Sequence, residues 1–337
     1  MKLAAIVVTF NRLAQLQVTV ARLLGETLDQ IIVVDNASSD ETPNWLAAQT
    51  DPRLHVITLC ENMGGAGGFE AGVVYARAQF DPDWLVLMDD DARPLATAIA
   101  RFRADFSTLL DPDCTAPDAV GAVAAAVLNM DGSICEMNRP SRNPFWHGKA
   151  FLAALQNLFT GKTRGGFHIT DAVMARDAPP SEIDVASFVG YFLARGAVAR
   201  AGLPDGGYFI YGDDVTYSLR LRHAGLRILM SPAVQFEHDC GTLSIDLATR
   251  PLWKVYYLSR NGVPMARLAA GVWLFPLALA YYIFVWARKT RYYLPQERPL
   301  YRRLMWTGLR DGLLGRRGRN DAAHAQSQAL ALTPTER

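Results

Sequence analysis

Three consecutive carboxylates, Asp89, Asp90 and Asp91, directly follow the apolar run Trp84–Met88. Alternate residues of an extended segment point the same way, so Asp89 and Asp91 share one face and can hold a hard divalent cation. Like charges at a buried strand end repel one another strongly unless a cation offsets them. The alternative is a solvated acidic turn, but the triplet favours a cation site.

A second acidic pair, Asp213 and Asp214, stands where an aromatic strand predicted over residues 206–212 runs into an amphipathic helix over Val215–Ala224. One carboxylate can cap that helix, which leaves the other free to face a cleft as a general base. The competing interpretation, of equal weight for the pair in isolation, is that both are ordinary charges in a first helical turn.

Two weaker signals accompany these carboxylates. His238 follows another apolar run, where a histidine is more often packed or solvated than a metal ligand; its value depends on whether it reaches the same cation as Asp89 and Asp91. The glycine-rich stretch 61–69 permits close backbone approach to an anion at a helix N-terminus, although it is neither a P-loop nor a G-x-G-x-x-G fingerprint.

The elements that must position these residues follow from short apolar runs that alternate with helical patterns, which predicts an α/β fold with a mostly parallel central sheet. Ligands bind beyond the carboxyl ends of such strands, where the acidic residues stand. Loops over the site are expected at 138–148 and 161–166. The predicted elements are strands at Ile6–Thr9, Ile31–Val34, Leu54–Thr58 and Trp84–Met88, and helices at Leu13–Leu24, Thr42–Gln49 and Phe69–Gln79.

The charge of the chain is unevenly distributed. The 337 residues carry a net charge of +1, but residues 287–337 contain 11 Lys and Arg against 4 acidic residues, a net of +7, which leaves −6 for the first 286. Near-neutrality argues against a nucleic-acid partner. The four cysteines, Cys60, Cys114, Cys135 and Cys240, lack metal-site spacing and fit a reducing compartment. We interpret the first apolar run as a buried strand rather than a secretory signal.

Residues 268–286 contain no charged residue, which is long enough for a membrane segment. A single span would place the basic tail on the far side from the catalytic body, against the positive-inside tendency, and Pro276 would break or kink a helix. A re-entrant or interface-lying helical hairpin fits better, with the tail on anionic headgroups. The alternative is a buried core helix with a solvated tail.

Taken together, these motifs resemble the family 2 glycosyltransferases with the GT-A (Rossmann-like) fold. The resemblance covers about residues 3–260. The triple Asp, the glycine-rich turn and His238 are most similar to the galactofuranosyltransferase branch, whereas residues 256–261, YYLSRN, also resemble bacterial rhamnosyltransferases. The ordered matches are Val8–Arg12, Val33–Ser38, Glu61–Gly65, Met88–Asp91 and Gly212–Asp214.

The resemblance implies roles for individual residues. Asp89, Asp91 and His238 would bind Mn²⁺ or Mg²⁺, Asp214 would be the catalytic base beside Asp213, and Asp90 would lie near the ribose or sugar. Tyr191 and Phe192 stand where relatives present aromatic residues, often Trp, to the acceptor. The residues implied to contact the nucleotide are Thr9, Phe10, Arg12, Asp35, Asn62, Gly64 and Gly65.

These features predict an inverting, metal-dependent glycosyltransferase on the cytoplasmic face of the inner or plasma membrane. It would move a hexosyl unit, galactofuranose from its UDP donor, onto a lipid-linked or polysaccharide glycan; the alternatives are a dTDP-rhamnose donor and a non-catalytic nucleotide-sugar-binding scaffold. A homo-oligomer is left open. The predicted organisation is a glycosyltransferase domain over 1–260 (a nucleotide-binding half to 95, then a metal and acceptor half), a membrane-associating helical region with basic tail over 261–320, and disorder over 321–337.

Overall fold

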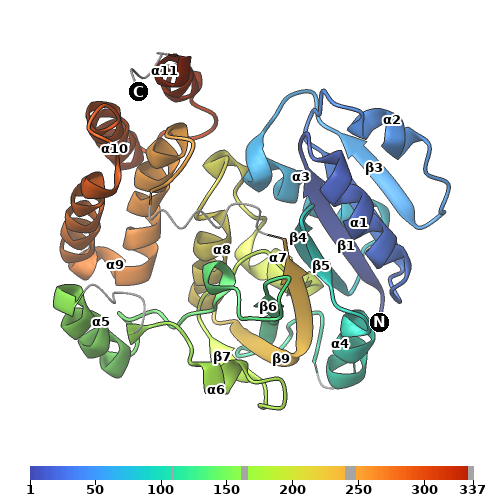
Figure 1. Ribbon diagram of the computed structural model, residues 1–337. Helices are drawn as coiled ribbons and strands as arrows, with labels where there is room; N and C mark the ends of the chain where they lie inside the picture. The colour runs from blue at the N-terminus through green and yellow to red at the C-terminus, as the bar shows by residue number, and fades with distance from the viewer. Residues whose placement is uncertain (108–109, 161–165, 240–247, 333–337) are drawn as a thin grey trace.

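The computed structural model describes residues 1–107, 110–160, 166–239 and 248–332. Within these ranges, nine strands form one sheet flanked by helices, and a group of long helices stands beside it (Figure 1). Cys240 and most of the loop predicted at 161–166 lie outside the described residues. The predicted α/β class is confirmed.

The N-terminal half of the sheet has the predicted architecture. Its four strands are all parallel, in the order β3-β2-β1-β4. Every predicted element is present within a few residues of its expected bounds. The elements are β1 Leu3–Thr9, α1 Leu13–Leu24, β2 Gln30–Asp35, α2 Thr42–Ala47, β3 Leu54–Thr58, α3 Gly64–Gln79 and β4 Trp84–Asp89.

Helix α3 begins at Gly64, five residues earlier than predicted, because the glycine-rich run forms its first turn. Two later glycines have a packing role. A Cβ atom at Gly68 would lie 2.4 Å from Val8 Cγ1, and one at Gly72 would lie 2.5 Å from Ile6 Cγ2. The missing side chains let α3 pack directly on β1, so only the start of the glycine run remains available to a ligand.

The second half of the sheet is mixed rather than parallel, with the order β4-β8-β6-β9-β5 and β7 paired to β9. Strand β8 is antiparallel to both neighbours, whereas β6 and β9 run parallel. The predicted strand over 206–212 is wrong: residues Gly206–Tyr208 form a single 3₁₀ turn, η3. The strands are β5 Ala92–Pro94, β6 Val120–Leu128, β7 Ser181–Ile183, β8 Tyr191–Ala194 and β9 Arg227–His238.

Most helical elements of this half lie beside or below the sheet, whereas α5 stands apart from it, next to the C-terminal helices (Figure 1). They are α4 Ala98–Phe106, η1 Glu136–Asn138, α5 Gly148–Thr160, α6 Asp171–Met174, α7 Arg195–Ala201 and α8 Asp213–His223.

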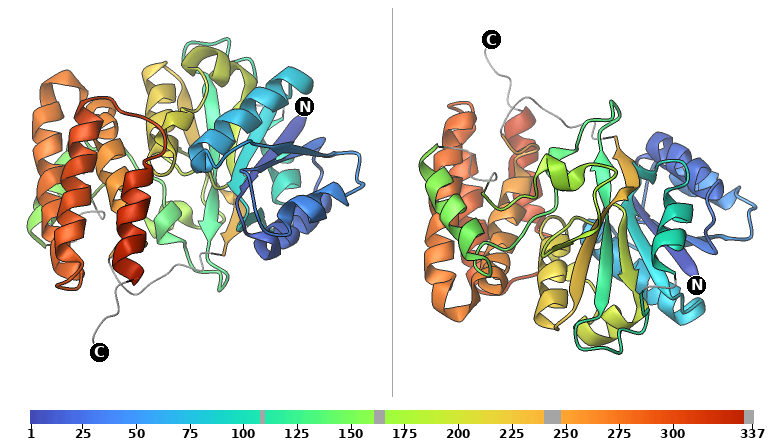
Figure 2. Two further views of the ribbon diagram at one scale, coloured as in Figure 1. Left: turned by 90° about the horizontal axis from the view of Figure 1, so that it is seen from above. Right: turned by 90° about the horizontal axis from the view of Figure 1, so that it is seen from below.

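The C-terminal region is a helical group, with α9 at Trp253–Lys289, η4 at Thr290–Tyr292, α10 at Arg298–Leu313 and α11 at Asp321–Leu332. Figure 2 shows its helices side by side. Residues Trp253–Tyr292 are long and apolar enough to cross a membrane by length and composition. However, Gly271 has non-helical angles, φ 66° and ψ 176°, in the middle of α9.

Helix α9 folds back on itself at Gly271. A Cβ atom at Gly262 would lie 2.5 Å from Trp286 Cζ2. In a straight helix these residues would be about 36 Å apart at 1.5 Å per residue, so α9 is a hairpin of two antiparallel legs. A helical hairpin is present, but it breaks at Gly271 rather than at Pro276, which remains inside the second leg, and its predicted place at a membrane stays a prediction.

Two boundaries differ from the sequence-based expectation. Residue 260 was the predicted domain boundary, but it falls inside the first leg of α9. The disorder predicted over 321–337 is wrong for residues Asp321–Leu332, which form α11; residues 333–337 lie outside the described part. Helix α11 forms because it packs on α9: His324 stacks on Trp253 with ring centroids 4.2 Å apart.

Candidate active site

The carboxyl ends of β1, β2 and β4 bring three predicted site residues side by side. Thr9 is in register with Asp35 on β2, and Val8 is in register with Asp89 on β4. Because these strands are parallel, the loops that follow them open on the same edge of the sheet. The predicted nucleotide and metal residues of the N-terminal half therefore lie in one region.

Asp90 is held by the first strand and by the loop that follows it. Thr9 Oγ1 donates to Asp90 Oδ2 at 2.8 Å, and Arg12 Nη1 donates to Asp90 Oδ1 at 3.1 Å. Thr19 Oγ1 fixes the backbone by donating to the Asp90 carbonyl at 2.6 Å. Asp90 is buried, and these contacts fix its orientation.

Asp91 and His238 lie close together, which is the condition stated above for both residues to bind the same cation. Strand β5 pairs with β9 so that Ala92 is opposite His238. His238 Nε2 lies 3.2 Å from Asp91 Oδ1, and His238 Nδ1 lies 2.8 Å from Asn138 Oδ1. Asn138, which the sequence analysis did not single out, orients the imidazole from behind.

Two side-chain cations balance the acidic triplet in this structure. Arg12 Nη1 lies 2.7 Å from Asp91 Oδ2. Burial disfavours the imidazolium form of His238, but its hydrogen bonds to Asp91 and Cys135 and the charges of Asp91 and Asp89 together outweigh burial and raise the pKa of His238 to about 10. The repulsion among these carboxylates was predicted to require a bound cation. In the structure, the positive charges of Arg12 and His238 reduce this repulsion.

The carboxylates of the triplet differ in their electrostatics. Burial, reinforced by the charge of Asp91, raises the pKa of Asp89 to about 7. Burial also raises the pKa of Asp90 to about 6, against the opposing charge of Arg12. Burial opposes ionisation of Asp91 as well, but the hydrogen bond with His238 and the contact with Arg12 outweigh it and lower the pKa of Asp91.

The donor set fits a divalent cation in its chemistry and only partly in its geometry. Asp91 and His238 supply the oxygen and nitrogen ligands that Mn²⁺ takes. Among the residues that the structure describes, no group of three or more His, Cys, Asp or Glu side chains is arranged to hold a metal ion. Asp89 therefore does not complete the predicted triad with Asp91 and His238 in this conformation.

The loop after β3 is tied to the loop after β2. Asn36 receives a hydrogen bond from Met63 N at its Oδ1 and donates from Nδ2 to the Gly64 carbonyl, both at 2.8 Å. Asn62 Oδ1 accepts from Gly64 N at 2.8 Å. A Cβ atom at Gly65 would have no neighbour within 4 Å, so its backbone borders open space. Asn62 thus shapes the loop, and Gly65 is its accessible point.

Asp35 carries an unsatisfied atom at the same edge of the sheet. Its side chain is fully buried, and Oδ1 accepts from Ser38 N at 3.0 Å. Among the described residues, Asp35 Oδ2 has no hydrogen-bond partner. A buried carboxylate oxygen without a donor is costly, and an N–H or O–H of a ligand would satisfy it. Phe10 follows Thr9, the register partner of Asp35, and is exposed, so it offers an apolar surface near this edge.

Asp213 and Asp214 form the first turn of α8, after Gly212, whose φ is 80°. Neither carboxylate caps the helix as predicted; Asp214 Oδ1 accepts instead from Val215 N at 2.7 Å. Burial raises the pKa of both carboxyls, that of Asp214 to about 6, and the charges of Asp214 and Asp89 further raise that of Asp213. The structure therefore brings the second acidic pair within electrostatic reach of Asp89.

The predicted acceptor residues are placed elsewhere. Tyr191 and Phe192 lie on β8 in the middle of the sheet, and both are fully buried. Phe192 stacks on Phe102 with ring centroids 3.9 Å apart. The prediction that they contact an acceptor is wrong in this conformation, because the aromatic run is core packing rather than a binding surface.

Lys254 is a site residue that the sequence analysis missed. It stands at the start of α9, and its Nζ lies 5.9 Å from the centroid of the Tyr211 ring. Burial and the charge of Arg12 lower its pKa, which places it within electrostatic reach of Arg12. No ion pair with an acidic side chain is present for Lys254 among the described residues. Nothing in its sequence context marked it, because its neighbourhood is created by the return of α9 to the domain.

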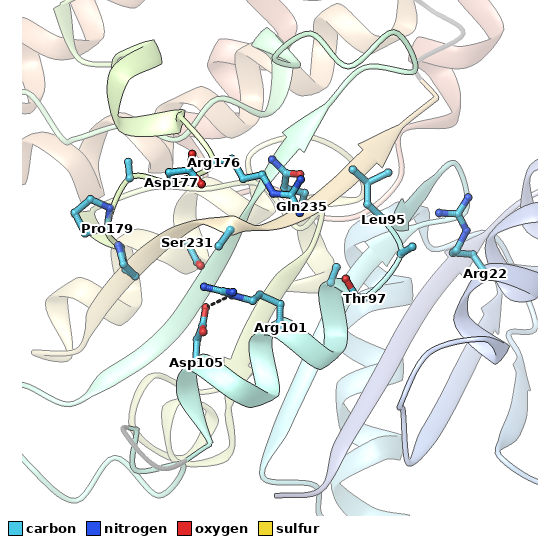
Figure 3. A pocket seen from close by; sticks show the side chains of 15 residues that line it. Arg22, Leu95, Thr97, Arg101, Asp105, Arg176, Asp177, Pro179, Ser231 and Gln235 are labelled. Atoms are coloured by element: carbon cyan, nitrogen blue, oxygen red, sulfur yellow. Dashed lines mark hydrogen bonds and ion pairs between the residues drawn. The ribbon is translucent and has the colours of Figure 1, made fainter.

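A cavity of about 750 Å³ lies away from these residues, between α4 and the segment after α6 (Figure 3). Arg22, Arg101, Arg176, Ser231 and Gln235 line it, and Asp105 pairs with Arg101. None of the predicted site residues lines it, so size alone does not locate the active site.

Comparison with known proteins identifies the family of the N-terminal half, which forms this edge of the sheet. The sequence profile described as "Glycosyl transferase family 2" matches residues 4–107, which contain the first acidic group and both loops. Residues 4–107 therefore form a family 2 glycosyltransferase domain, and the chain is a glycosyltransferase.

Curated relatives extend this match beyond the N-terminal half. Galactofuranosyltransferase GlfT1 of Mycolicibacterium smegmatis is 27% identical over 242 residues, which cover 71% of each chain. Galactofuranosyltransferase GlfT1 of Mycobacterium tuberculosis is 28% identical over 248 residues, 71% of this chain and 70% of the relative.

A solved structure supports the fold of this glycosyltransferase. The mannosyltransferase PcManGT from Pyrobaculum calidifontis, in complex with GDP-Man and Mn²⁺, superimposes with a TM-score of 0.51 at 16% identity, over 97% of this chain and 87% of that chain. The likeness confirms the predicted GT-A fold.

Proposed function

We propose that this glycosyltransferase transfers a galactofuranosyl unit from UDP-galactofuranose to a glycan acceptor, with inversion and with the help of a divalent cation. The observation that carries the proposal is the meeting of two acidic groups at one edge of the sheet, one balanced by Arg12 and His238 and the other at the start of α8. The donor sugar is proposed because the two curated relatives reported above are galactofuranosyltransferases.

The nucleotide would bind across the ends of β1, β2 and β3. The unsatisfied Asp35 Oδ2 is suited to accept a hydrogen bond from the nucleoside. Gly65 offers an open backbone at the start of α3, where the helix dipole favours negative charge, and Gly64, packed against the Phe209 carbonyl, sets the turn before it. Thr9, Phe10, Arg12 and Asn62 surround this space, and Asp90 would face the ribose or sugar.

Asp91 and His238, with Asp89 after a small shift, are the residues that would hold Mn²⁺ or Mg²⁺. When bound, the cation stabilises the negative charge of the leaving diphosphate. For this to occur, His238 has to release its proton and Arg12 has to leave Asp91. Lys254, which has no ion pair with an acidic side chain among the described residues, would then contact the diphosphate together with Arg12, whose contact with Asp90 can remain.

Asp214 would take the proton of the acceptor hydroxyl. Its side chain is partly buried at the start of α8, and its pKa, raised to about 6, keeps it ionised near neutrality and yet basic enough to accept a proton. Attack on the anomeric carbon by one activated hydroxyl inverts the configuration. Because the acidic triplet would bind the cation and the donor diphosphate, none of its carboxylates acts as a nucleophile. The sugar would therefore be transferred in a single displacement.

The second leg of α9 would lie on a membrane surface. Trp273, Leu277 and Phe284 are exposed at spacings of four and seven residues, so they share one face of the leg, and Trp273 is 93% exposed. Arg288, Lys289 and Arg291 follow at its end. An apolar face with basic residues beside it binds the interface of anionic membranes. A lipid-linked acceptor would be presented there.

A donor screen tests the proposed activity. Purified full-length protein with Mn²⁺ and detergent-solubilised lipid extract is given UDP-galactofuranose or dTDP-rhamnose, and sugar incorporation is measured. We expect incorporation from UDP-galactofuranose only. Incorporation from dTDP-rhamnose alone would replace the donor assignment, and nucleotide-sugar binding without incorporation from any donor would favour a scaffold.

A vesicle assay tests the membrane surface. Sedimentation with vesicles containing anionic lipid is compared for wild type, Trp273→Ser with Leu277→Ser, and the control Val18→Ser, an exposed apolar residue on α1. We expect the double variant alone to lose most of its binding. Equal sedimentation of all three proteins contradicts the proposed surface.

A further inference from the structure

The segment that leads into Asp213 has an unusual backbone. Phe209 and Tyr211 have φ values of 63° and 68°, and Gly212 follows with a φ of 80°. Side chains other than glycine rarely adopt the left-handed region, so residues 207–211 do not hold this shape through local preference. Contacts from elsewhere in the chain must maintain it.

Asn261 on the first leg of α9 supplies such contacts. Its Nδ2 donates to the carbonyls of Tyr208 at 3.1 Å, Ile210 at 2.8 Å and Tyr211 at 2.7 Å. The side chain is 2% exposed. One side-chain amide with two hydrogens thus donates to three carbonyls of a single segment. A simple surface contact between two domains would not require so many hydrogen bonds from one side chain.

Arg260, its neighbour, also donates hydrogen bonds to this segment. Its Nη2 donates to the Tyr208 carbonyl at 2.7 Å and to the Gly207 carbonyl at 3.3 Å, and its Nε donates to Asn261 Oδ1 at 2.8 Å. The guanidinium lies 4.9 Å from the centroid of the Tyr257 ring. The buried charge is therefore spent on backbone carbonyls and an aromatic face rather than on a carboxylate.

The same segment also contacts the glycine-rich start of α3, where the donor nucleotide is proposed to bind and which we call the donor loop. Ala66 N donates to the Phe209 carbonyl at 3.2 Å. A Cβ atom at Gly64 would lie 2.0 Å from that carbonyl oxygen, so the two loops pack with no room to spare. Residues 207–211 consequently connect the donor loop, the acidic pair and α9.

We infer that Arg260 and Asn261 are positioning residues that hold residues 207–211 so that Asp214 faces the acceptor. Helix α9 is thereby part of the active site as well as a surface for the membrane. The inference rests on the proposed function, because it takes Asp214 as the base. It also gives a physical role to the Arg-Asn pair that the sequence analysis noted only as a resemblance.

Asn261→Ala in the full-length protein tests this inference. Removing the amide frees three carbonyls of a strained segment, and misplacement of a catalytic group by about 1 Å costs on the order of 10²-fold in rate. We expect kcat to fall by about 10²-fold while the affinity for UDP with Mn²⁺ changes by about twofold or less. Hydrogen exchange at the amides of residues 207–212 should accelerate at least about tenfold, since their present hydrogen bonds depend on the held conformation.

The matched control is Ser259→Ala. Ser259 is equally buried on the same turn, but its hydroxyl donates only within α9, to the Val255 carbonyl at 2.9 Å. We expect it to leave kcat and the exchange of residues 207–212 near wild-type values. If Asn261→Ala does not fold, Arg260→Lys, which keeps the charge and loses the fork of donors, replaces it with the same expected pattern.

Unchanged exchange over residues 207–212, or a loss of kcat no greater than that of Ser259→Ala, overturns the inference. The exchange measurement does not depend on the reaction. If the wild-type protein transfers no sugar from any donor, the proposed function fails, whereas the exchange data still decide whether α9 holds the segment.

Discussion

The two acidic groups of the site are built in opposite ways. Asp89–Asp91 lies between two cations, Arg12 and His238, so its charge is balanced within the chain. Asp213 and Asp214 have no ion pair with a basic side chain among the described residues, and burial raises the pKa of both. In the proposed mechanism, the first group exchanges its side-chain cations for a metal ion, and the second gains and loses a proton.

We therefore propose that the two groups serve the two halves of the reaction. A carboxylate group that can exchange its side-chain cations for a metal ion suits the donor diphosphate, whose charge must be neutralised as it leaves. A pair of carboxylates with a raised pKa suits proton transfer from a hydroxyl near neutral pH. Because the two groups are separate, a substitution in one group can impair its step of the reaction without impairing the other step.

The largest expected effect is that of Asp214→Asn. The amide cannot accept the acceptor proton, so turnover should fall by about 10²–10⁴-fold, the usual contribution of a general base. Sugar transfer under saturating donor is the measurement, and Asp118→Asn, which removes an exposed carboxylate, is the control. Turnover within about twofold of wild type would remove Asp214 from the mechanism.

The pH profile of kcat sharpens the comparison. Asp214 acts only when ionised and its pKa is raised to about 6, so kcat should be flat above that pH and fall about tenfold per pH unit below it. Asp213→Asn removes a neighbouring negative charge and should move the midpoint to lower pH. A profile that keeps its wild-type midpoint in Asp213→Asn would show that the pair does not titrate together.

The smallest effect concerns Arg12. Its contact with Asp91 is partly exposed and is worth up to about 1 kcal/mol, so Arg12→Gln should tighten binding of Mn²⁺ alone by about fivefold at most, while weakening binding of UDP. Calorimetric titration with Mn²⁺ measures it. Arg22→Gln serves as the control, because Arg22 lies near Glu237 rather than the triplet. Weaker Mn²⁺ binding in Arg12→Gln would contradict competition for Asp91.

The N-terminal half of the chain could be predicted from sequence because its information is local. Each strand is a short apolar run, and each site residue, such as Asp35 or Asp89, directly follows one. The carboxyl-end rule for parallel strands then places these residues together without further knowledge. His238 also follows an apolar run, and the structure places it beside Asp91, although its role as a metal ligand stays a prediction.

The parts that sequence reasoning missed depend on contacts between distant segments. Tyr191 and Phe192 read as an aromatic binding surface, but an antiparallel strand at the centre of the sheet buries both. Residues 206–212 resemble a strand in composition, yet hydrogen bonds from Arg260 and Asn261 hold them in an irregular loop. Helix α11 has little amphipathic pattern of its own, and packing on α9 stabilises it.

Binding of UDP in the presence and absence of Mn²⁺, measured by calorimetry on Asp214→Asn and Asp91→Asn, tests the division of labour most directly. The account predicts that Asp214→Asn binds UDP like wild type, with the same enhancement by Mn²⁺, and that Asp91→Asn loses this enhancement. Equal losses in both variants, or loss in Asp214→Asn alone, would contradict the assignment of the two acidic groups to separate steps.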